Sequence, residues 1–175
     1  MGTDPLPGLR PGRDDDADAV VELIGATWAE YPGVVLDVDA EEPWMLAPAT
    51  SFDAWGGTFW VLPRPGSRHL DACVGVRPTR QGRAAELKSL YVAAGARRRG
   101  YGARLVRRVE QWVRERGMDH VLLWSDARFA DAHRLYERLG YARSGRSREL
   151  HDLSDTTELE FVATLDGAHN AYSRQ

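Results

Sequence analysis

The most informative segment of this 175-residue chain is ELKSLYVAAGARRRGYGARLVRRVEQWVRERG, residues 86–117. It begins inside a strand-like segment, residues 84–92, in which alternate residues from Glu86 to Val92 are expected to share one face. Apolar residues then return at helical spacing until Gly117, a residue type that ends helices. The stretch therefore predicts a β-strand, a turn and an amphipathic helix.

The turn between this strand and this helix is rich in glycine and arginine. The first N–H groups of a helix have no partner within it, and the helix dipole adds positive charge there, so phosphate is a natural ligand. Gly100 and Gly102 allow the backbone to approach an anion closely, and Arg97, Arg98 and Arg99 add charge nearby. The turn is a candidate anion site; the alternative is an ordinary turn with solvated arginines.

The spacing of this turn excludes the two commonest phosphate motifs. A dinucleotide fingerprint needs a third glycine where Leu105 stands, and a P-loop needs Gly-Lys-Ser/Thr, which does not occur. What remains is R-x-x-G-x-G, from Arg97 to Gly102, placed between a strand and a helix.

The rest of the chain alternates helices and strands. The expected elements, in order, are a helix within 16–31, one or two short helices within 32–57, strands over 58–62, 70–78 and 84–92, the helix ended by Gly117, a strand over 120–126, a helix ended by Gly140, and strands over 141–150 and 157–165. This order predicts an α/β domain with a mixed, mostly antiparallel sheet of six to seven strands and about four helices. We expect one domain over 1–165 and a frayed tail over 166–175.

Bulk properties exclude several functional classes. The net charge of −3 gives no reason to expect nucleic-acid binding, and no apolar run is long enough to span a membrane. Cys73 is the only cysteine and lies in an apolar strand, so we interpret it as a buried hydrophobe. The five histidines show no metal-binding spacing, so no metal is expected. Without a secretory signal, a cytoplasmic location is expected.

Two blocks of the sequence carry a family resemblance. Residues 86–117 resemble the strand, pyrophosphate loop and helix of the GNAT superfamily of acetyl-coenzyme A-dependent N-acetyltransferases. Residues 120–141, HVLLWSDARFADAHRLYERLGY, resemble the next strand and helix and end in the family's pattern A-x-x-L-Y-x-x-x-G-[FY]. The resemblance implies direct transfer of an acetyl group from acetyl-coenzyme A to a primary amine.

The resemblance also implies how the cofactor is held. Backbone groups of the strand would pair with the pantetheine arm, and backbone N–H groups of the turn would bind the pyrophosphate, with Arg97 as the basic residue of the motif. The strand residues are Leu90, Tyr91 and Val92, and the turn residues are Arg98, Arg99, Gly100, Tyr101, Gly102 and Ala103.

Three residues are the candidates for catalysis. Tyr136 matches the tyrosine that protonates the departing thiolate, a step that a neutral phenol can perform. Glu86 matches the general-base glutamate of histone-acetylating relatives, and Asp126, at the end of the next strand, is a second candidate. The alternatives are a core tyrosine, a solvated strand residue and a helix N-cap, respectively.

The same sequence features are compatible with other functions. A coenzyme A-binding regulatory module would need the turn but no catalytic residue, and a different acyl-coenzyme A, such as succinyl-coenzyme A, could be the donor. The expected acceptor is a small-molecule amine or a peptide amine. Neither a nucleic acid nor a membrane is expected as a partner, and the sequence is compatible with a homodimer.

Overall fold

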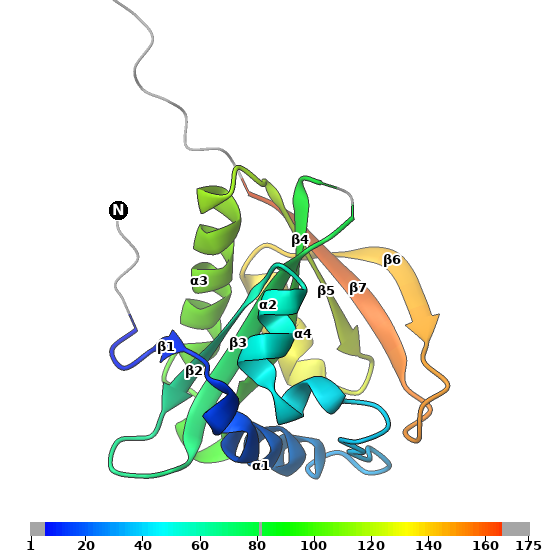
Figure 1. The fold of residues 1–175 in the computed structure, drawn as a ribbon. Coiled ribbons are helices and arrows are strands. Elements are labelled where there is room, and N and C mark those ends of the chain that lie inside the picture. The colour runs from blue at the N-terminus through cyan, green and yellow to red at the C-terminus, as the bar shows by residue number, and fades with distance from the viewer. Residues whose placement is uncertain (1–5, 81, 166–175) are drawn as a thin grey trace, which may run out of the picture.

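The computed structural model describes residues 6–80 and 82–165 (Figure 1). The predicted tail at 166–175 lies outside these residues. The elements are β1 (Arg10–Pro11), η1 (Asp14–Asp16), α1 (Ala17–Trp28), η2 (Pro43–Leu46), α2 (Pro48–Ala54), β2 (Thr58–Pro63), β3 (Leu70–Pro78), β4 (Ala84–Val92), η3 (Ala94–Ala96), α3 (Tyr101–Glu115), β5 (His120–Asp126), α4 (Ala130–Arg138), β6 (Ala142–Glu149) and β7 (Thr157–Thr164). The predicted fold class is confirmed, and β1 is the strand that the sequence did not indicate.

The seven strands form one sheet in the order β1-β2-β3-β4-β5-β7-β6. All neighbouring pairs are antiparallel except β4 and β5, which are joined by α3 and run parallel. A parallel pair needs a crossover connection, and the amphipathic helix predicted after the glycine-rich turn provides it. No helix in the described part of the chain is both long and apolar enough to cross a lipid bilayer.

Helices cover both faces of the sheet, and each face has its own core (Figure 1). On one face, the predicted stripe of α3 is buried against the middle strands; its members are Leu105, Val106, Val109, Trp112 and Val113. On the other face, α1, η2 and α2 enclose a second cluster that contains Ile24, Met45 and Phe52. Burial of side chains on both faces explains why the central strands are apolar along most of their length.

A bulge in β4 overturns the expected alternation of this strand. Cys73 of β3 pairs with Tyr91 and Gly75 pairs with Lys88, so β4 has one residue more than β3 between these pairs. Ser89 lies at the bulge with φ +59°. Before the bulge Leu87 faces the α3 core, and after it Leu90 does, because the extra residue reverses the alternation. Glu86 and Lys88 therefore do not share a face with Leu90 and Val92.

The parallel pair separates soon after it begins. β4 and β5 are paired over Ala84–Glu86 and His120–Leu122 and not beyond, although each strand continues for several residues. β4 stays paired with β3 as far as Val92, and β5 stays paired with β7 as far as Asp126. The sheet therefore splits between β4 and β5, at the ends nearest the glycine-rich turn.

Replacing Gly75 with alanine should destabilise the fold by about 2 kcal/mol, the usual cost of overpacking a core. A Cβ at position 75 would overlap Cε1 and Cζ of Phe52, whose side chain is fully buried. Urea denaturation should show the loss as a lower midpoint with an unchanged slope. Gly95→Ala is the matched control, because its Cβ would meet no atom within 4 Å. A Gly75→Ala midpoint equal to that of Gly95→Ala would contradict the prediction.

Candidate active site

A groove of about 620 Å³ lies beside α4; we call it the α4 groove. Its walls come from the end of β4, the glycine-rich turn with the start of α3, and α4, together with Thr27 and Tyr31 at the end of α1. Of the predicted cofactor-binding residues, those lining it are Leu90, Tyr91, Val92, Arg97, Arg98, Gly100, Tyr101, Gly102 and Ala103. Arg99 is the exception, because its guanidinium donates to the carbonyl of Gly95.

The backbone of the turn presents its N–H groups to this groove. Arg98 and Gly100 have φ values of +60° and +76°, so the chain coils back on itself before α3 begins at Tyr101. Among the described residues, no acceptor takes a hydrogen bond from the N–H groups of residues 98–103. These unpaired donors lie where the positive end of the α3 dipole is, which suits a phosphate group.

The side chain of Arg97 has a different environment from the one expected. Its Nη1 and Nη2 atoms bind both carboxylate oxygens of Glu30 at 2.6 Å, and its Nε donates to the Val92 carbonyl at 3.1 Å. The guanidinium is thus already paired, and it joins the end of α1 to the end of β4. An anion at the turn would meet the unpaired backbone donors, and the side chains of Arg98, Arg134 and Arg138 also line the groove.

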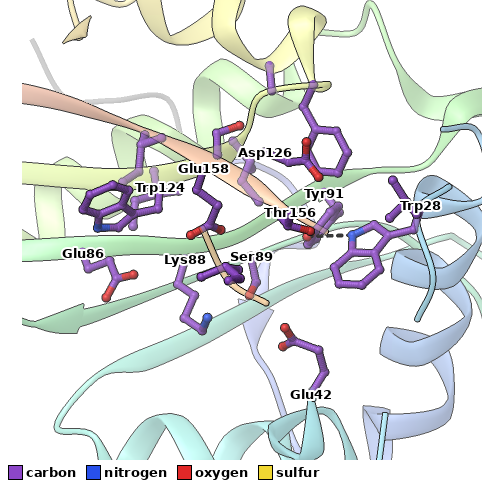
Figure 2. A pocket seen from close by; sticks show the side chains of 18 of the residues that line it. Trp28, Glu42, Glu86, Lys88, Ser89, Tyr91, Trp124, Asp126, Thr156 and Glu158 are labelled. Atoms are coloured by element: carbon purple, nitrogen blue, oxygen red, sulfur yellow. Dashed lines mark hydrogen bonds between the residues drawn. The ribbon is translucent and has the colours of Figure 1, made fainter. Parts of the chain in front are cut away.

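A second, smaller cavity of about 120 Å³ opens on the other side of the split; we call it the central pocket (Figure 2). Its walls come from β4, β5 and β7, together with the η2 region and the turn before β7. Among the aromatic residues of the N-terminal half, Trp28 and Trp44 line it, whereas Phe52 and Trp60 belong to the two cores. Trp28 Nε1 donates to the Tyr91 hydroxyl at 2.9 Å and orients that ring.

The two cavities meet at the split in the sheet. Five residues line both of them, namely Leu90, Tyr91, Phe129, Ala132 and Tyr136. Tyr136 is 5% exposed and packs on Tyr141 and Phe161, yet its hydroxyl makes no hydrogen bond with the described residues. Burial raises the pKa of the phenol, so the Tyr136 hydroxyl at this junction stays protonated at neutral pH.

Glu86 and Asp126 both line the central pocket, and both are paired with arginines. Nε and Nη2 of Arg77 both lie 2.7 Å from Oε2 of Glu86, and Oε1 accepts no hydrogen bond from the described residues. Asp126 is held by Arg128 through both oxygens and also accepts from the Arg128 backbone N–H at 2.8 Å. Glu86 therefore keeps one oxygen free, whereas both oxygens of Asp126 are engaged. The N-cap of α4 is Phe129, not Asp126.

Five further charged residues that the sequence did not indicate line the central pocket, among them Arg148, Asp152 and the three described next. Glu42 comes from the residue before η2, Lys88 from β4 and Glu158 from β7 (Figure 2). Glu158 pairs with Arg148, and burial raises the pKa of its carboxyl. These three positions are far apart in the chain, and no local pattern connects them.

Two titratable side chains close to the site are structural. Cys73 is fully buried, as predicted, and burial raises the pKa of its thiol to about 12, so it offers no thiolate. His133 is also buried; its Nε2 lies 3.2 Å from Ser125 Oγ, and burial lowers the pKa of its ring. Both belong to the packing around the site.

Comparison with known proteins agrees with this architecture. The sequence profile of the Acetyltransferase (GNAT) family matches residues 21–141. The chain is 30% identical over 138 residues to the aminoglycoside N(6')-acetyltransferase type 1 of Serratia marcescens, covering 75% of this chain and 89% of that one. It is 32% identical over 154 residues to the mycothiol acetyltransferase of Salinispora tropica, covering 79% of this chain but only 44% of that longer protein.

The fold has counterparts among solved structures. A GNAT-family acetyltransferase of Staphylococcus aureus Mu50 superposes with a TM-score of 0.77 at 17% sequence identity, over 90% of this chain and 98% of that one. The profile match over residues 21–141 includes the two parallel strands that separate, β4 and β5. It also includes the turn whose N–H groups are unpaired. The protein belongs to the GNAT acetyltransferase family and is an acyltransferase enzyme.

Proposed function

We propose that the protein transfers an acetyl group from acetyl-coenzyme A, bound in the α4 groove, to a primary amine bound in the central pocket. The observation that carries this proposal is that the two cavities meet at the split between β4 and β5, where five residues line both. A donor and an acceptor that enter from the two cavities would meet beside the Tyr136 hydroxyl. Such proximity supplies much of the rate acceleration in a two-substrate reaction.

The residues of the α4 groove fit coenzyme A by their chemistry. The N–H groups of residues 98–103 would hold the pyrophosphate, and the end of β4, which lacks a β5 partner, would pair with the amide-containing pantetheine arm. Val92 contributes mainly its N–H to this surface, because its carbonyl already accepts from Arg97. The acetyl group would then lie beside Leu90 and the bulge of β4.

The chain's own groups account for the proton transfers. Glu86 accepts a proton from the amine, directly or through a water molecule, with its free Oε1. Backbone N–H groups near the bulge polarise the carbonyl oxygen, and Tyr136 protonates the leaving sulfur. Asp126 takes no part in this scheme, because Arg128 engages both of its oxygens. Transfer is direct, and no covalent enzyme intermediate is needed.

We infer that the acceptor is an amine. The two curated relatives are named for an aminoglycoside and for mycothiol, two acceptors of different structure. These two relatives are named for different acceptors although each is about equally identical to this chain. Membership of the family therefore does not by itself identify the acceptor of this protein. The carboxylates around the central pocket favour a cationic amine over a neutral or anionic acceptor.

A thermal-shift assay followed by a thiol-release assay tests the proposal. Acetyl-coenzyme A should raise the melting temperature progressively with concentration, as expected for a ligand of the folded state, whereas NADH and ATP should not. Thiol release is then screened with acetyl- and succinyl-coenzyme A against kanamycin, a diamine and short peptides. The absence of any shift at saturating acetyl-coenzyme A would overturn the proposal.

Replacing Gly102 with alanine should raise the KM for acetyl-coenzyme A about tenfold, equivalent to about 1.4 kcal/mol of binding free energy. The added Cβ would lie 2.9 Å from Cδ2 of Leu135, whose side chain lines the α4 groove and would be pushed into it. Steady-state kinetics with varied acetyl-coenzyme A should show this change with kcat nearly unaffected. Gly95→Ala again serves as the control, and an equal KM in both variants would contradict the placement of the cofactor.

A further inference from the structure

Lys88 is the only lysine among the 23 lysine and arginine residues of the chain, and it lies in the central pocket. An arginine would provide the same charge, but its guanidinium stays protonated in proteins and therefore does not attack an acetyl group. A lysine amine, in contrast, can lose its proton and act as a nucleophile. The one side-chain amine in the chain is therefore placed where an acceptor amine is proposed to bind.

The bulge of β4 determines which way Lys88 faces. Because the alternation reverses at Ser89, Lys88 lies on the face that carries the central pocket, whereas Leu90 packs toward the α3 core. Both residues nevertheless line the central pocket, which meets the α4 groove at the split in the sheet. The Lys88 amine and the proposed position of the acetyl group beside Leu90 therefore border the same cavity.

The surroundings of Lys88 leave its amine free to move. It forms no hydrogen bond or ion pair with the described residues. Of the neighbouring carboxylates, Glu86 is paired with Arg77 and Glu158 with Arg148, and Glu42 accepts from Trp44 Nε1 (Figure 2). The amine is thus close to carboxylates that can take its proton, without being held by any of them.

We propose that Lys88 is a self-acetylation site of this enzyme, an inference that rests on the proposed function. With acetyl-coenzyme A bound and no acceptor present, Nζ attacks the acetyl carbonyl carbon. An N–C bond forms, the C–S bond breaks, and the products are Nε-acetyl-lysine and coenzyme A. The ammonium loses two protons in total: one is balanced by the proton that Tyr136 gives to the sulfur, and the other leaves through a pocket carboxylate to water.

The modification would change the central pocket. Acetylation removes the positive charge of Lys88 and adds three heavy atoms to a side chain that borders a cavity of about 120 Å³. The α4 groove, whose lining residues do not include Lys88, would be unchanged. The self-acetylated enzyme should therefore still bind coenzyme A but should accept an external amine less well.

Mass spectrometry of the full chain incubated with acetyl-coenzyme A alone tests the inference. The intact mass should rise by one acetyl group, with one thiol released per chain. Trypsin cleaves after lysine and arginine but not after acetyl-lysine, so the peptides 84–88 and 89–97 should be replaced by a single acetylated peptide, 84–97. Because this peptide contains Lys88 and not the N-terminus, it distinguishes acetylation of Lys88 from acetylation of the N-terminal amine, the other amine of the chain. Lys88→Arg should release no thiol and gain no acetyl group at position 88.

Chemical acetylation and failure of the proposed function are distinguished by two further measurements. Urea-unfolded protein reports the uncatalysed rate, and the folded enzyme should modify Lys88 at least tenfold faster, while Tyr136→Phe should slow the folded reaction. Equal rates in the folded and unfolded protein would overturn the inference. A thermal shift with acetyl-coenzyme A but no modification of Lys88 would overturn the inference and leave the proposed function standing. The absence of a thermal shift would overturn both.

Discussion

The Tyr136→Phe variant should lose at least about 100-fold in kcat, because general-acid catalysis typically contributes that much or more. The hydroxyl lies where the α4 groove meets the central pocket, and it makes no hydrogen bond with the described residues that would be broken. The KM for acetyl-coenzyme A and the melting temperature should therefore change little. Steady-state kinetics by thiol release, with any amine that the screen identifies, measures the effect.

The pH dependence of kcat gives a second test of Tyr136. Burial raises the pKa of the phenol above its ordinary value, so the proton is retained to higher pH than in a free tyrosine. Wild-type kcat should accordingly show no decline from ionisation of this group below about pH 10. The same kinetics apply to Tyr141→Phe, the matched control, which removes a buried hydroxyl that contacts Glu110. A kcat loss as large in Tyr141→Phe would argue against a special role for Tyr136.

The Glu86→Gln variant should lose about 100-fold in kcat/KM for the amine, the lower range for general-base catalysis. Glutamine has almost the same shape but accepts a proton poorly, so the reaction would depend on the fraction of amine that is already neutral. The deficit should therefore shrink as the pH rises toward the pKa of the acceptor amine. Measurement of kcat/KM against pH for both enzymes would reveal this convergence.

The Asp126→Asn variant is the contrasting case. Its carboxylate is 7% exposed and is tied to Arg128 through both oxygens, so neutralising it leaves a partly buried guanidinium without its counter-charge. The expected result is a lower melting temperature, with a normal pH dependence of kcat/KM at temperatures where the variant is folded. If Asp126→Asn showed the pH-dependent deficit and Glu86→Gln did not, the roles given to the two carboxylates would have to be exchanged.

Most of the fold could be predicted because its signals are local. The strand over 120–126 and the stripe of α3 are set by runs of apolar residues whose period needs no knowledge of their partners. The bulge in β4 was not predictable in this way, because it is a relation between two strands. Ser89 is an ordinary strand residue in the sequence, and its φ of +59° arises where the register between β3 and β4 shifts, opposite the segment from Cys73 to Gly75.

The α4 groove and the central pocket also differ in how far local sequence patterns could predict them. The turn over 97–103 is one uninterrupted segment of the chain, so its glycines can be recognised from the sequence alone. The central pocket is assembled from Glu42, Lys88 and Glu158, which lie on different elements. Their proximity depends on the order of strands in the sheet and on the split between β4 and β5, neither of which any short segment specifies.

Local sequence patterns specify the strand–turn–helix unit, the order of the elements and the residue types available for an anion and for a proton transfer. Which charges are free to act depends instead on contacts in the folded structure, some of them between elements that are far apart in the chain. Arg97 is paired with Glu30 and Asp126 with Arg128, whereas Glu86 keeps one oxygen and Lys88 keeps its amine without a partner among the described residues. The reason is physical: a residue type sets what a side chain can do, but its neighbours across the sheet set whether that capacity is already used.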